Sequence, residues 1–362
     1  MWDASRDDLP TEIAQLEQLR SMVESEFDVE EGLIEHGSHT FYVRTRQDSK
    51  KGFLRLIKRL DTIGFVPVLR KNGKKTALRI IHRPPATLSR RTISMILFFA
   101  TVGTTLFTGY TLSQGFVAED FMPNPTIGAV SFASAIMTIL VVHEVSHKLA
   151  THIHGIRATA PYFIPGPPMP YGVGTFGAVI QQRSLPPNKD ALFDLGFGGP
   201  FAGFIMTMII TIIGIQLSPT VSRPPPGMVD PPMPILFRLL VEAFATIPPG
   251  HYLLLHPIAF AGCIGMLVTM LNLVPVGMLD GGHAARGVLG ETPRNVLSFF
   301  SILLLLVLGH YLMAVLALLL SLQRHPGPLD DVSELTTGRK LATLVLVLIF
   351  VLCIVPIRPV LR

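Results

Sequence analysis

The stretch from Thr126 to Ala150 reads TIGAVSFASAIMTILVVHEVSHKLA. It contains no ionisable residue before His143, and a bilayer is crossed by a helix of about 20 predominantly apolar residues. The uncharged run then meets His143, Glu144 and His147. Ionisable side chains inside a spanning helix are costly and by default mark a functional site. This stretch therefore predicts a membrane helix that carries polar chemistry near one end.

The composition of the whole chain agrees with a membrane location. Of its 362 residues, 49% are hydrophobic and 15% are charged, whereas soluble proteins carry about 25% charged residues. An ordinary cytosolic enzyme is therefore excluded. Cys263 and Cys353 lie in separate apolar runs, which excludes a disulfide scaffold and a cysteine zinc site. The basic residues behind the net charge of +5 are mixed with acids or flank apolar runs, so no nucleic-acid partner is expected.

Further apolar runs predict a polytopic α-helical membrane protein with about six transmembrane helices, which contacts the lipid bilayer directly. The membrane domain is expected at residues 87–362, with its core at about 92–290. The predicted spans are Thr92–Leu112, Thr126 to about Ala150, Leu195–Leu217, Pro257–Leu279, Val296–Leu322 and Leu341–Ile357.

The beginning of the chain has a different composition. Residues 1–91 hold 17 of the 30 Lys and Arg residues and 13 of the 25 Asp and Glu residues. Apolar residues recur at helical spacing from Ile13 to Val23 and from Phe53 to Ile63, and Asn72-Gly73 is a strong β-hairpin signal. Residues 1–86 therefore predict a small soluble α/β domain. It contains no metal or phosphate motif, so we expect it to bind a regulatory protein or ligand.

Basic residues predict the orientation in the membrane. Arg90 and Arg91 precede the first predicted span, whereas the loop after that span carries only Glu119 and Asp120. Lys and Arg in short loops stay on the cytoplasmic side. We therefore expect a cytoplasmic N-terminus and, with six spans, a cytoplasmic C-terminus. The polar end of the second span then lies nearer the cytoplasmic side.

His143 and His147 are four residues apart, so their imidazoles lie on one helical face and can bind one zinc ion. Glu144 is placed to take a proton from the attacking water. Without a metal, these groups would stay unpaired near hydrocarbon, which costs on the order of several kcal/mol. Zinc hydrolases use three protein ligands. Asp280, the only carboxylate near the fourth apolar run, would complete a site for one Zn²⁺ per chain.

Two motifs together resemble the site-2 protease family of intramembrane metalloproteases. These are HEVSH at 143–147 and NLVPVGMLDG at 272–281. PYFIP at 161–165, GTFGAVI at 174–180 and the later LFD and Gly-Pro pair extend the resemblance over about residues 90–290. These stretches are similar to the branch that contains the plastid ethylene-dependent gravitropism-deficient proteins and microbial relatives.

The resemblance implies roles for individual residues. His143, His147 and Asp280 would bind zinc, and Glu144 would be the catalytic base. The protein would lie in the plasma membrane of a microbe. Many relatives have an asparagine near the position of Gly203, so this resemblance assigns no role to Gly203.

Other polar residues are weaker candidates. Asn272 lies eight residues before Asp280, a little over two helical turns, so it can face the same cavity and donate a hydrogen bond to the scissile carbonyl oxygen. An interhelical hydrogen bond is its alternative role. His283 either supports a ligand or lies in a cytoplasmic loop. The remaining histidines are expected to be interfacial or packed, namely His152, His154 and His310.

The segment 161–184 is too polar and too rich in Pro and Gly for a spanning helix. Its loose alternation predicts a re-entrant strand or hairpin that dips toward the active site. A free strand edge there can pair with an unwound substrate, and a structural plug is the alternative. The predicted substrate-binding residues are Gly174, Thr175, Phe176, Gly177 and Ala178.

These patterns together predict an intramembrane zinc metalloprotease that hydrolyses a peptide bond in or near a transmembrane segment of a membrane-protein substrate. The alternatives are a zinc-binding membrane transporter and a non-proteolytic membrane scaffold. Glu144 discriminates between protease and transporter, because a transporter needs no base beside a metal ligand.

Overall fold

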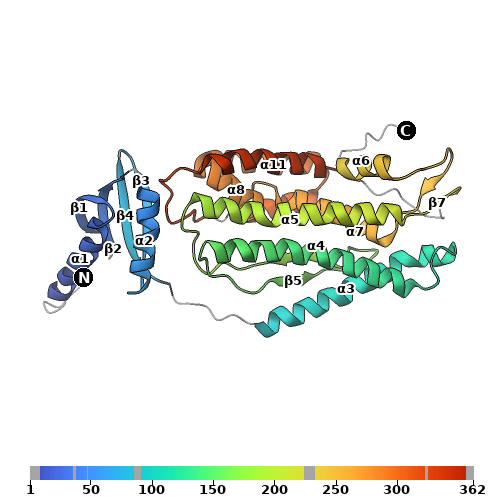
Figure 1. The fold of residues 1–362 in the computed structure, drawn as a ribbon, viewed down its shortest axis with the longest axis horizontal. Coiled ribbons are helices and arrows are strands. Elements are labelled where there is room, and N and C mark those ends of the chain that lie inside the picture. The colour runs from blue at the N-terminus through green and yellow to red at the C-terminus, as the bar shows by residue number, and fades with distance from the viewer. Residues whose placement is uncertain are drawn as a thin grey trace. The chain divides into compact units, whose positions relative to one another are not determined.

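The computed structural model describes residues 9–35, 38–46, 48–84, 91–223, 233–322 and 325–355. The chain divides into two compact units, which Figure 1 shows as ribbons and which are described separately. Unit 1 comprises Met1–Thr87, Leu185–Leu192 and Pro326–Thr336. Unit 2 comprises Leu88–Ser184, Phe193–His325 and Thr337–Arg362.

Unit 1 is an antiparallel sheet packed with two helices around the fully buried Phe53. The strand order is β1-β2-β4-β3. The Asn-Gly hairpin is confirmed, because Asn72 pairs with Lys75 and Gly73 has a φ of 59°, which favours glycine. The elements are α1 (Leu9–Glu24), β1 (Asp28–Glu35), β2 (Ser38–Arg44), α2 (Ser49–Asp61), β3 (Phe65–Asn72) and β4 (Lys75–His82).

Two segments from later in the chain complete unit 1. The N–H of Leu69 in β3 donates to the carbonyl oxygen of Leu329 at 2.9 Å, and the N–H of Asp331 donates to the carbonyl oxygen of Leu69 at 3.2 Å. Lys50 in α2 pairs with Asp190 at 2.6 Å. These contacts join residues that are more than a hundred positions apart, so no local sequence pattern reveals them.

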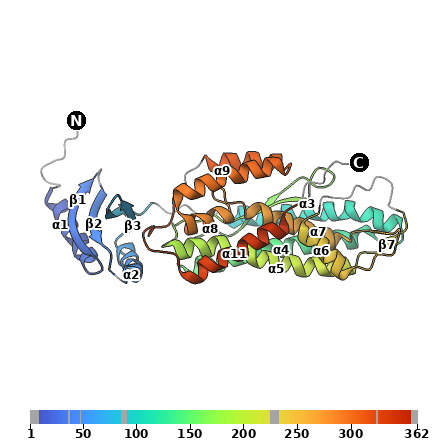
Figure 2. The ribbon, with the colours of Figure 1, turned by 90° about the horizontal axis from the view of Figure 1, so that it is seen from above.

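Unit 2 is a helical bundle. Three helices are long and apolar enough to cross a membrane: α3 (Arg91–Ala118), α4 (Pro125–Ile153) and α5 (Lys189–Gln216), whose first turn belongs to unit 1. Figures 1 and 2 show α4, α5 and α11 running along the bundle. The shorter helices are α6 (Ile235–Phe244), α7 (Pro257–Asn272), α8 (Asp280–Leu289), α9 (Glu291–Val307), α10 (Tyr311–Ser321) and α11 (Thr337–Cys353). The strands are β5 (Tyr162–Pro165), β6 (Thr175–Val179), β7 (Thr220–Val221) and β8 (Tyr252–Leu253).

Two of the six predicted spans are wrong as continuous helices. The fourth, Pro257–Leu279, ends as α7 at Asn272. Pro275 lacks a backbone donor and Gly277 has a φ of 53°, so neither suits a continued helix. The fifth, Val296–Leu322, is two helices, α9 and α10, separated at Gly309 with a φ of 77°.

Helices α9 and α10 fold back on each other. Arg294, near the start of α9, and Ser321, at the end of α10, line one cavity together with Gly277. The hairpin therefore returns the chain to the end of the bundle where α8 begins. As a result, α11 runs in the same direction as α5.

Helices α3 and α11 run in the same direction along unit 2 (Figure 1). Near the start of α3, Ser94 Oγ donates to the carbonyl oxygen of Pro161 at 2.5 Å, just beyond the end of α4. Just beyond the end of α11, the N–H of Ile235 donates to the carbonyl oxygen of Ile354 at 3.0 Å. Six alternating crossings would make the first and last helices antiparallel, which differs from the arrangement of α3 and α11. Arg90 and residues 356–362 lie outside the described residues.

Candidate metal centre

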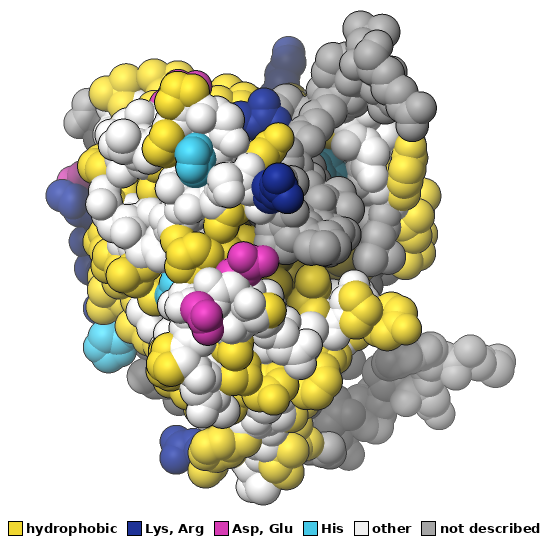
Figure 3. Space-filling view, turned by 90° about the vertical axis from the view of Figure 1, so that its right-hand side faces the viewer, with side chains coloured by type: hydrophobic (Ala, Val, Ile, Leu, Met, Phe, Trp, Pro, Cys, Tyr) yellow, Lys and Arg dark blue, Asp and Glu magenta, His cyan; other side chains and the backbone are white. Residues whose placement is uncertain are grey.

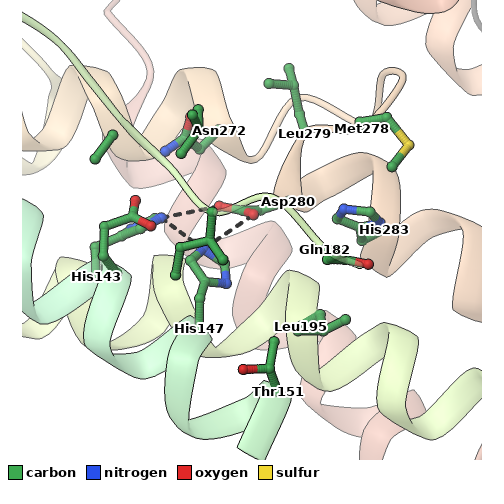
Figure 4. A pocket seen from close by; sticks show the side chains of 14 residues that line it. His143, His147, Thr151, Gln182, Leu195, Asn272, Met278, Leu279, Asp280 and His283 are labelled. Atoms are coloured by element: carbon green, nitrogen blue, oxygen red, sulfur yellow. Dashed lines mark hydrogen bonds and ion pairs between the residues drawn. The ribbon is translucent and has the colours of Figure 1, made fainter. Parts of the chain in front are cut away.

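A cavity of about 140 Å³ lies in unit 2 among α4, β6, the start of α5 and α8. The cavity is lined by His143, Glu144 and His147 from one segment and by Asp280 from another, far away in the sequence. Figure 4 shows the two histidines and Asp280 facing one another. Its lining residues are His143, Glu144, His147, Thr151, Ala178, Val179, Ile180, Gln182, Leu195, Asn272, Met278, Leu279, Asp280 and His283.

The ligand atoms of His143, His147 and Asp280 are close enough to share one metal ion. His143 Nε2 is 3.2 Å from Asp280 Oδ2, and His147 Nε2 is 3.3 Å from Asp280 Oδ1. The two Nε2 atoms are 3.0 Å apart. Bond lengths of about 2.0–2.2 Å in a tetrahedral zinc site separate neighbouring ligand atoms by about 3.3–3.5 Å. The three residues therefore fit zinc in both donor chemistry and spacing.

The two sides of this centre are built differently. His143 and His147 lie on successive turns of α4, as the spacing predicts. Asp280 is the first residue of α8 and follows the turn formed by residues 273–279. A Cβ at Gly281 would lie 2.0 Å from the carbonyl oxygen of Leu273. Glycine is therefore needed for α8 to begin directly against this turn.

Helix α5 approaches the histidines with its backbone. A Cβ at Gly199 would lie 2.1 Å from His147 Nε2, and a Cβ at Gly203 would lie 3.0 Å from His143 Nδ1. The backbone of Leu195 also hydrogen-bonds to the His147 ring. Contacts of this kind orient metal ligands. Gly203 thus leaves room for a ligand ring, a function that the sequence did not indicate.

Glu144 lies in the cavity beside the three ligands. The residue is 4% exposed, and its Oε2 has no hydrogen-bond partner among the described residues. On a helix it is turned about 100° from His143. Burying a charged oxygen without a partner is costly. The position therefore suits a carboxylate whose partner is a water molecule or a substrate group.

Asn272 and His283 reach the cavity by a different route from the predicted one. Asn272 is the last residue of α7 and does not share a helix with Asp280, but the intervening turn brings both to the cavity (Figure 4). His283 is buried, not in a loop, and its Nδ1 is 2.9 Å from Nε2 of His325. Burial lowers the pKa of His283 to about 4 and the pKa of His325 to about 3, so both rings are neutral at pH 7.

Several residues of the site carried no sequence signal. Thr151, Gln182 and Met278 line the cavity, but isolated residues of these types are too common to stand out. Outside the cavity, His154 Nε2 lies 2.8 Å from Asp194, which also pairs with Arg339 of α11. His154 therefore belongs to a network of polar contacts around Asp194, and the structure brings neither it nor His152 or His310 to the metal centre.

Strands β5 and β6 form the hairpin predicted for the segment 161–184. Tyr162 pairs with Val179, and Phe163 pairs with Ala178. Glycine is required at position 177, where φ is 95°. One edge of β6 pairs with β5, and among the described residues no strand pairs with its other edge.

The five predicted substrate-binding residues differ in their surroundings. Ala178 lines the cavity, whereas Gly174 lies against α3, where its carbonyl oxygen accepts a hydrogen bond from Thr104 Oγ1 at 2.6 Å. Thr175 is buried, and the Phe176 side chain is 65% exposed. The end of the segment nearest the metal ligands is therefore Ala178, which Val179 and Ile180 continue along the cavity.

The long apolar helices and the centre on HEVSH define a membrane protein with a two-histidine, one-aspartate metal site. The sequence profile of Peptidase family M50 matches residues 131–316, more than half of the chain. The chain belongs to this family.

Named relatives agree with this assignment. The chain is 30% identical over 325 residues to "Probable zinc metalloprotease EGY1, chloroplastic" of Oryza sativa subsp. japonica, covering 79% of this chain and 55% of the relative. It is 29% identical over 301 residues to the protein of the same name from Arabidopsis thaliana, covering 75% and 54%. The chain thus spans about half the length of these relatives. No solved structure matches it.

Proposed function

We propose that the protein is a zinc-dependent endopeptidase that hydrolyses a peptide bond in or near a transmembrane segment of another membrane protein. Such cleavage is the chemical step of regulated intramembrane proteolysis. The observation that carries the proposal is the 3.0–3.3 Å spacing of the ligand atoms of His143, His147 and Asp280, beside a Glu144 Oε2 atom that has no hydrogen-bond partner in the described part of the chain. Membership of a peptidase family and the names of the relatives support the same chemistry.

The residues of the cavity would have separate roles in peptide hydrolysis. His143, His147 and Asp280 would hold one Zn²⁺, which when bound supplies a Lewis acid that polarises the scissile carbonyl and activates water. A carboxylate oxygen of Glu144 accepts the proton of the attacking water and then delivers it to the nitrogen of the leaving amine. The Asn272 amide donates a hydrogen bond to the carbonyl oxygen as negative charge develops there.

The substrate would bind as an extended strand along β6, over the residues Gly174, Thr175, Phe176, Gly177 and Ala178. The free edge of β6 and the position of Ala178 beside the metal ligands support this proposal. Pairing of main chains holds a peptide bond without requiring one particular side chain. If β6 is instead a structural plug, a change in its backbone hydrogen bonding should leave cleavage normal.

The metal centre would face the cytoplasm, on the side where α3 begins. Arg91 at the start of α3 supports this orientation. Figure 3 views the opposite end of the bundle, where hydrophobic side chains cover much of the described surface. The N-terminal domain would then be cytoplasmic and bind a regulator, and the end of α11 would face the other side. The relatives are chloroplastic by name, and the microbial plasma membrane stays our prediction for this chain.

Glu144→Gln tests the mechanism, because glutamine has nearly the same shape but cannot accept the proton. We expect zinc content at the wild-type level and cleavage of single-span substrates slower by about 10²- to 10⁴-fold. Glu119→Gln, an exposed change of the same kind beyond α3, is the control and should alter neither quantity. Zinc content is measured by elemental analysis of the same purified samples.

Full activity of Glu144→Gln would refute the mechanism. Absence of cleavage by the zinc-loaded wild-type protein would favour the transporter or the scaffold. Zinc uptake into sealed vesicles that contain the protein separates these two alternatives.

A further inference from the structure

A second cavity, of about 420 Å³, lies between α9 and α10, outside the metal centre. Its polar side is formed by Arg294 and Asn295 near the start of α9 and by Ser321 at the end of α10. Its apolar side includes Phe299 and Leu318. The cavity is therefore polar at the ends of the two helices and apolar along their length.

Arg294 is buried in this cavity without a full set of partners. The residue is 4% exposed. Its guanidinium donates to the carbonyl oxygen of Gly277 at 3.4 Å and to Asn295 Oδ1, and Nε has no partner among the described residues. The positive charge of Arg286, which is 2% exposed, acts on the same group. Buried arginines are seldom left without an anionic partner.

The protein supplies one carboxylate at this cavity, that of Glu291. Glu291 is exposed, and no ion pair joins it to Arg294 in the described part of the chain. Its charge acts on Arg294, but among the described residues no hydrogen bond joins the two side chains. An external anion would therefore complete the coordination of Arg294 better than Glu291 does.

The start of α9 adds further donors. Gly290 precedes the helix and provides no capping side chain, so the N–H groups of Glu291 and Thr292 lack intrahelical acceptors, whereas Pro293 has no N–H. The positive end of the helix dipole lies at the same place. Helix N-termini and the planar fork of arginine both suit phosphate. The guanidinium of Arg294, the side-chain amide of Asn295 and the start of α9 thus form one set of donors.

We infer that the cavity between α9 and α10 binds a phosphate group, carried by an anionic phospholipid whose acyl chains lie along Phe299 and Leu318. These two side chains are 66% and 50% exposed, as expected for surfaces that contact lipid in a membrane protein. The polar donors lie at the helix ends, where a lipid phosphate would sit. The same chemistry also accepts free phosphate, and the experiment separates the two sources.

Binding at this site would affect the position of Asp280 in the metal centre through the backbone of the turn before it. Arg294 holds the carbonyl oxygen of Gly277, which belongs to the turn that precedes Asp280. A phosphate that fixes Arg294 therefore also fixes this turn.

The test uses the purified full chain in a neutral detergent. Phosphatidylglycerol with short acyl chains, the diacylglycerol of the same chain length and inorganic phosphate are titrated separately. Bound lipid is counted by native mass spectrometry, and the unfolding temperature is followed in parallel. We expect phosphatidylglycerol to bind saturably and diacylglycerol, which lacks the phosphate, to bind far less. If inorganic phosphate raises the unfolding temperature as much as phosphatidylglycerol does, the site takes free phosphate, and the lipid assignment is overturned.

Variants identify the site. Arg294→Gln should weaken phosphatidylglycerol binding by about tenfold or more, because it removes charged hydrogen bonds. Glu291→Gln, an exposed change, should strengthen binding severalfold by removing a like charge from the rim. Arg238→Gln, at an exposed position on α6, is the control and should bind as the wild type does.

Wild-type affinity in a folded Arg294→Gln variant overturns the proposal, as does equal binding of diacylglycerol and phosphatidylglycerol. If Arg294→Gln does not fold, Glu291→Gln decides: unchanged affinity in that variant overturns the proposal, and tighter binding supports it.

Discussion

The metal centre is shared between two regions of opposite character. Helix α4 runs without interruption from Pro125 to Ile153 and carries His143, Glu144 and His147. The chain that brings Asp280 is interrupted: α7 ends at Asn272, a turn follows, and α8 begins at Asp280 itself. A continuous helix fixes the geometry of its residues through its own hydrogen bonds. A turn depends on the residues packed around it, so the two regions should respond differently to mutation.

The largest effect should come from removing the ligand on the turn. Asp280→Ala takes away one of three donors, so bound zinc and cleavage should both fall by more than the 10- to 100-fold that is typical when a supporting contact is lost. Zinc content and cleavage rate are measured on one preparation. Asp120→Asn, at an exposed residue with a φ of 59° that asparagine tolerates, is the control. Stoichiometric zinc in Asp280→Ala would mean that the third ligand lies elsewhere, with His283 the next candidate.

The second prediction concerns the close packing of α5 against the histidines of α4. Gly199→Ala places a methyl group only 2.1 Å from the present position of His147 Nε2. The His147 ring would have to rotate away from the position in which it faces the other two ligands, so zinc affinity should fall by about 10- to 100-fold while the helix content persists. Competition with a chelator gives the affinity, and circular dichroism gives the helix content. Gly103→Ala on α3, where a Cβ meets nothing within 4 Å, should leave both unchanged.

The third prediction concerns the strand beside both regions. Ala178→Pro removes a backbone donor from β6, so cleavage should fall by about tenfold or more while zinc content stays at the wild-type level. Phe176→Ala on the same strand removes an exposed side chain and keeps the backbone donor, so it should be affected much less. If Ala178→Pro cleaves normally, β6 is a plug and does not hold the substrate.

The smallest effect should come from the far end of α4. Asn124 Oδ1 accepts a hydrogen bond from the N–H of Thr126 at 2.8 Å and caps the helix. Asn124→Ala should lower the free energy of unfolding by about 1 kcal/mol, measured by chemical denaturation in detergent. Asn124→Ser, which keeps a capping oxygen, should lose less. Loss of zinc in Asn124→Ala would contradict the view that α4 holds its ligands independently of its end.

The parts of the structure that were predictable depend on short sequence distances. The spacing of His143 and His147 and the turn at Gly73 are set within a few residues. The break in the fourth span is different, because membrane helices tolerate Pro and Gly when neighbouring segments satisfy the freed backbone groups. The structure shows the turn through the positive φ of Gly277 and through its packing, since a Cβ there would lie 2.8 Å from the carbonyl oxygen of Leu320 in α10.

The contacts that complete unit 1 were beyond prediction for a related reason. Leu329 pairs with Leu69 across about 260 positions of sequence, and neither residue differs from an ordinary buried leucine. Asp280 was identified because a carboxylate is rare in an apolar run, which is a signal of composition and not of structure. The candidate site residues were therefore easier to predict than the course of the backbone that brings them together.

The proposed pairing of the substrate with β6 affects the kinetics of the reaction. A peptide that pairs with a strand is extended, so a helical segment must first unwind. Unwinding breaks several cooperative hydrogen bonds, which makes local helix stability in the substrate a determinant of rate. Segments weakened by Gly or Pro near the bond would then be cut soonest, whatever side chains flank that bond.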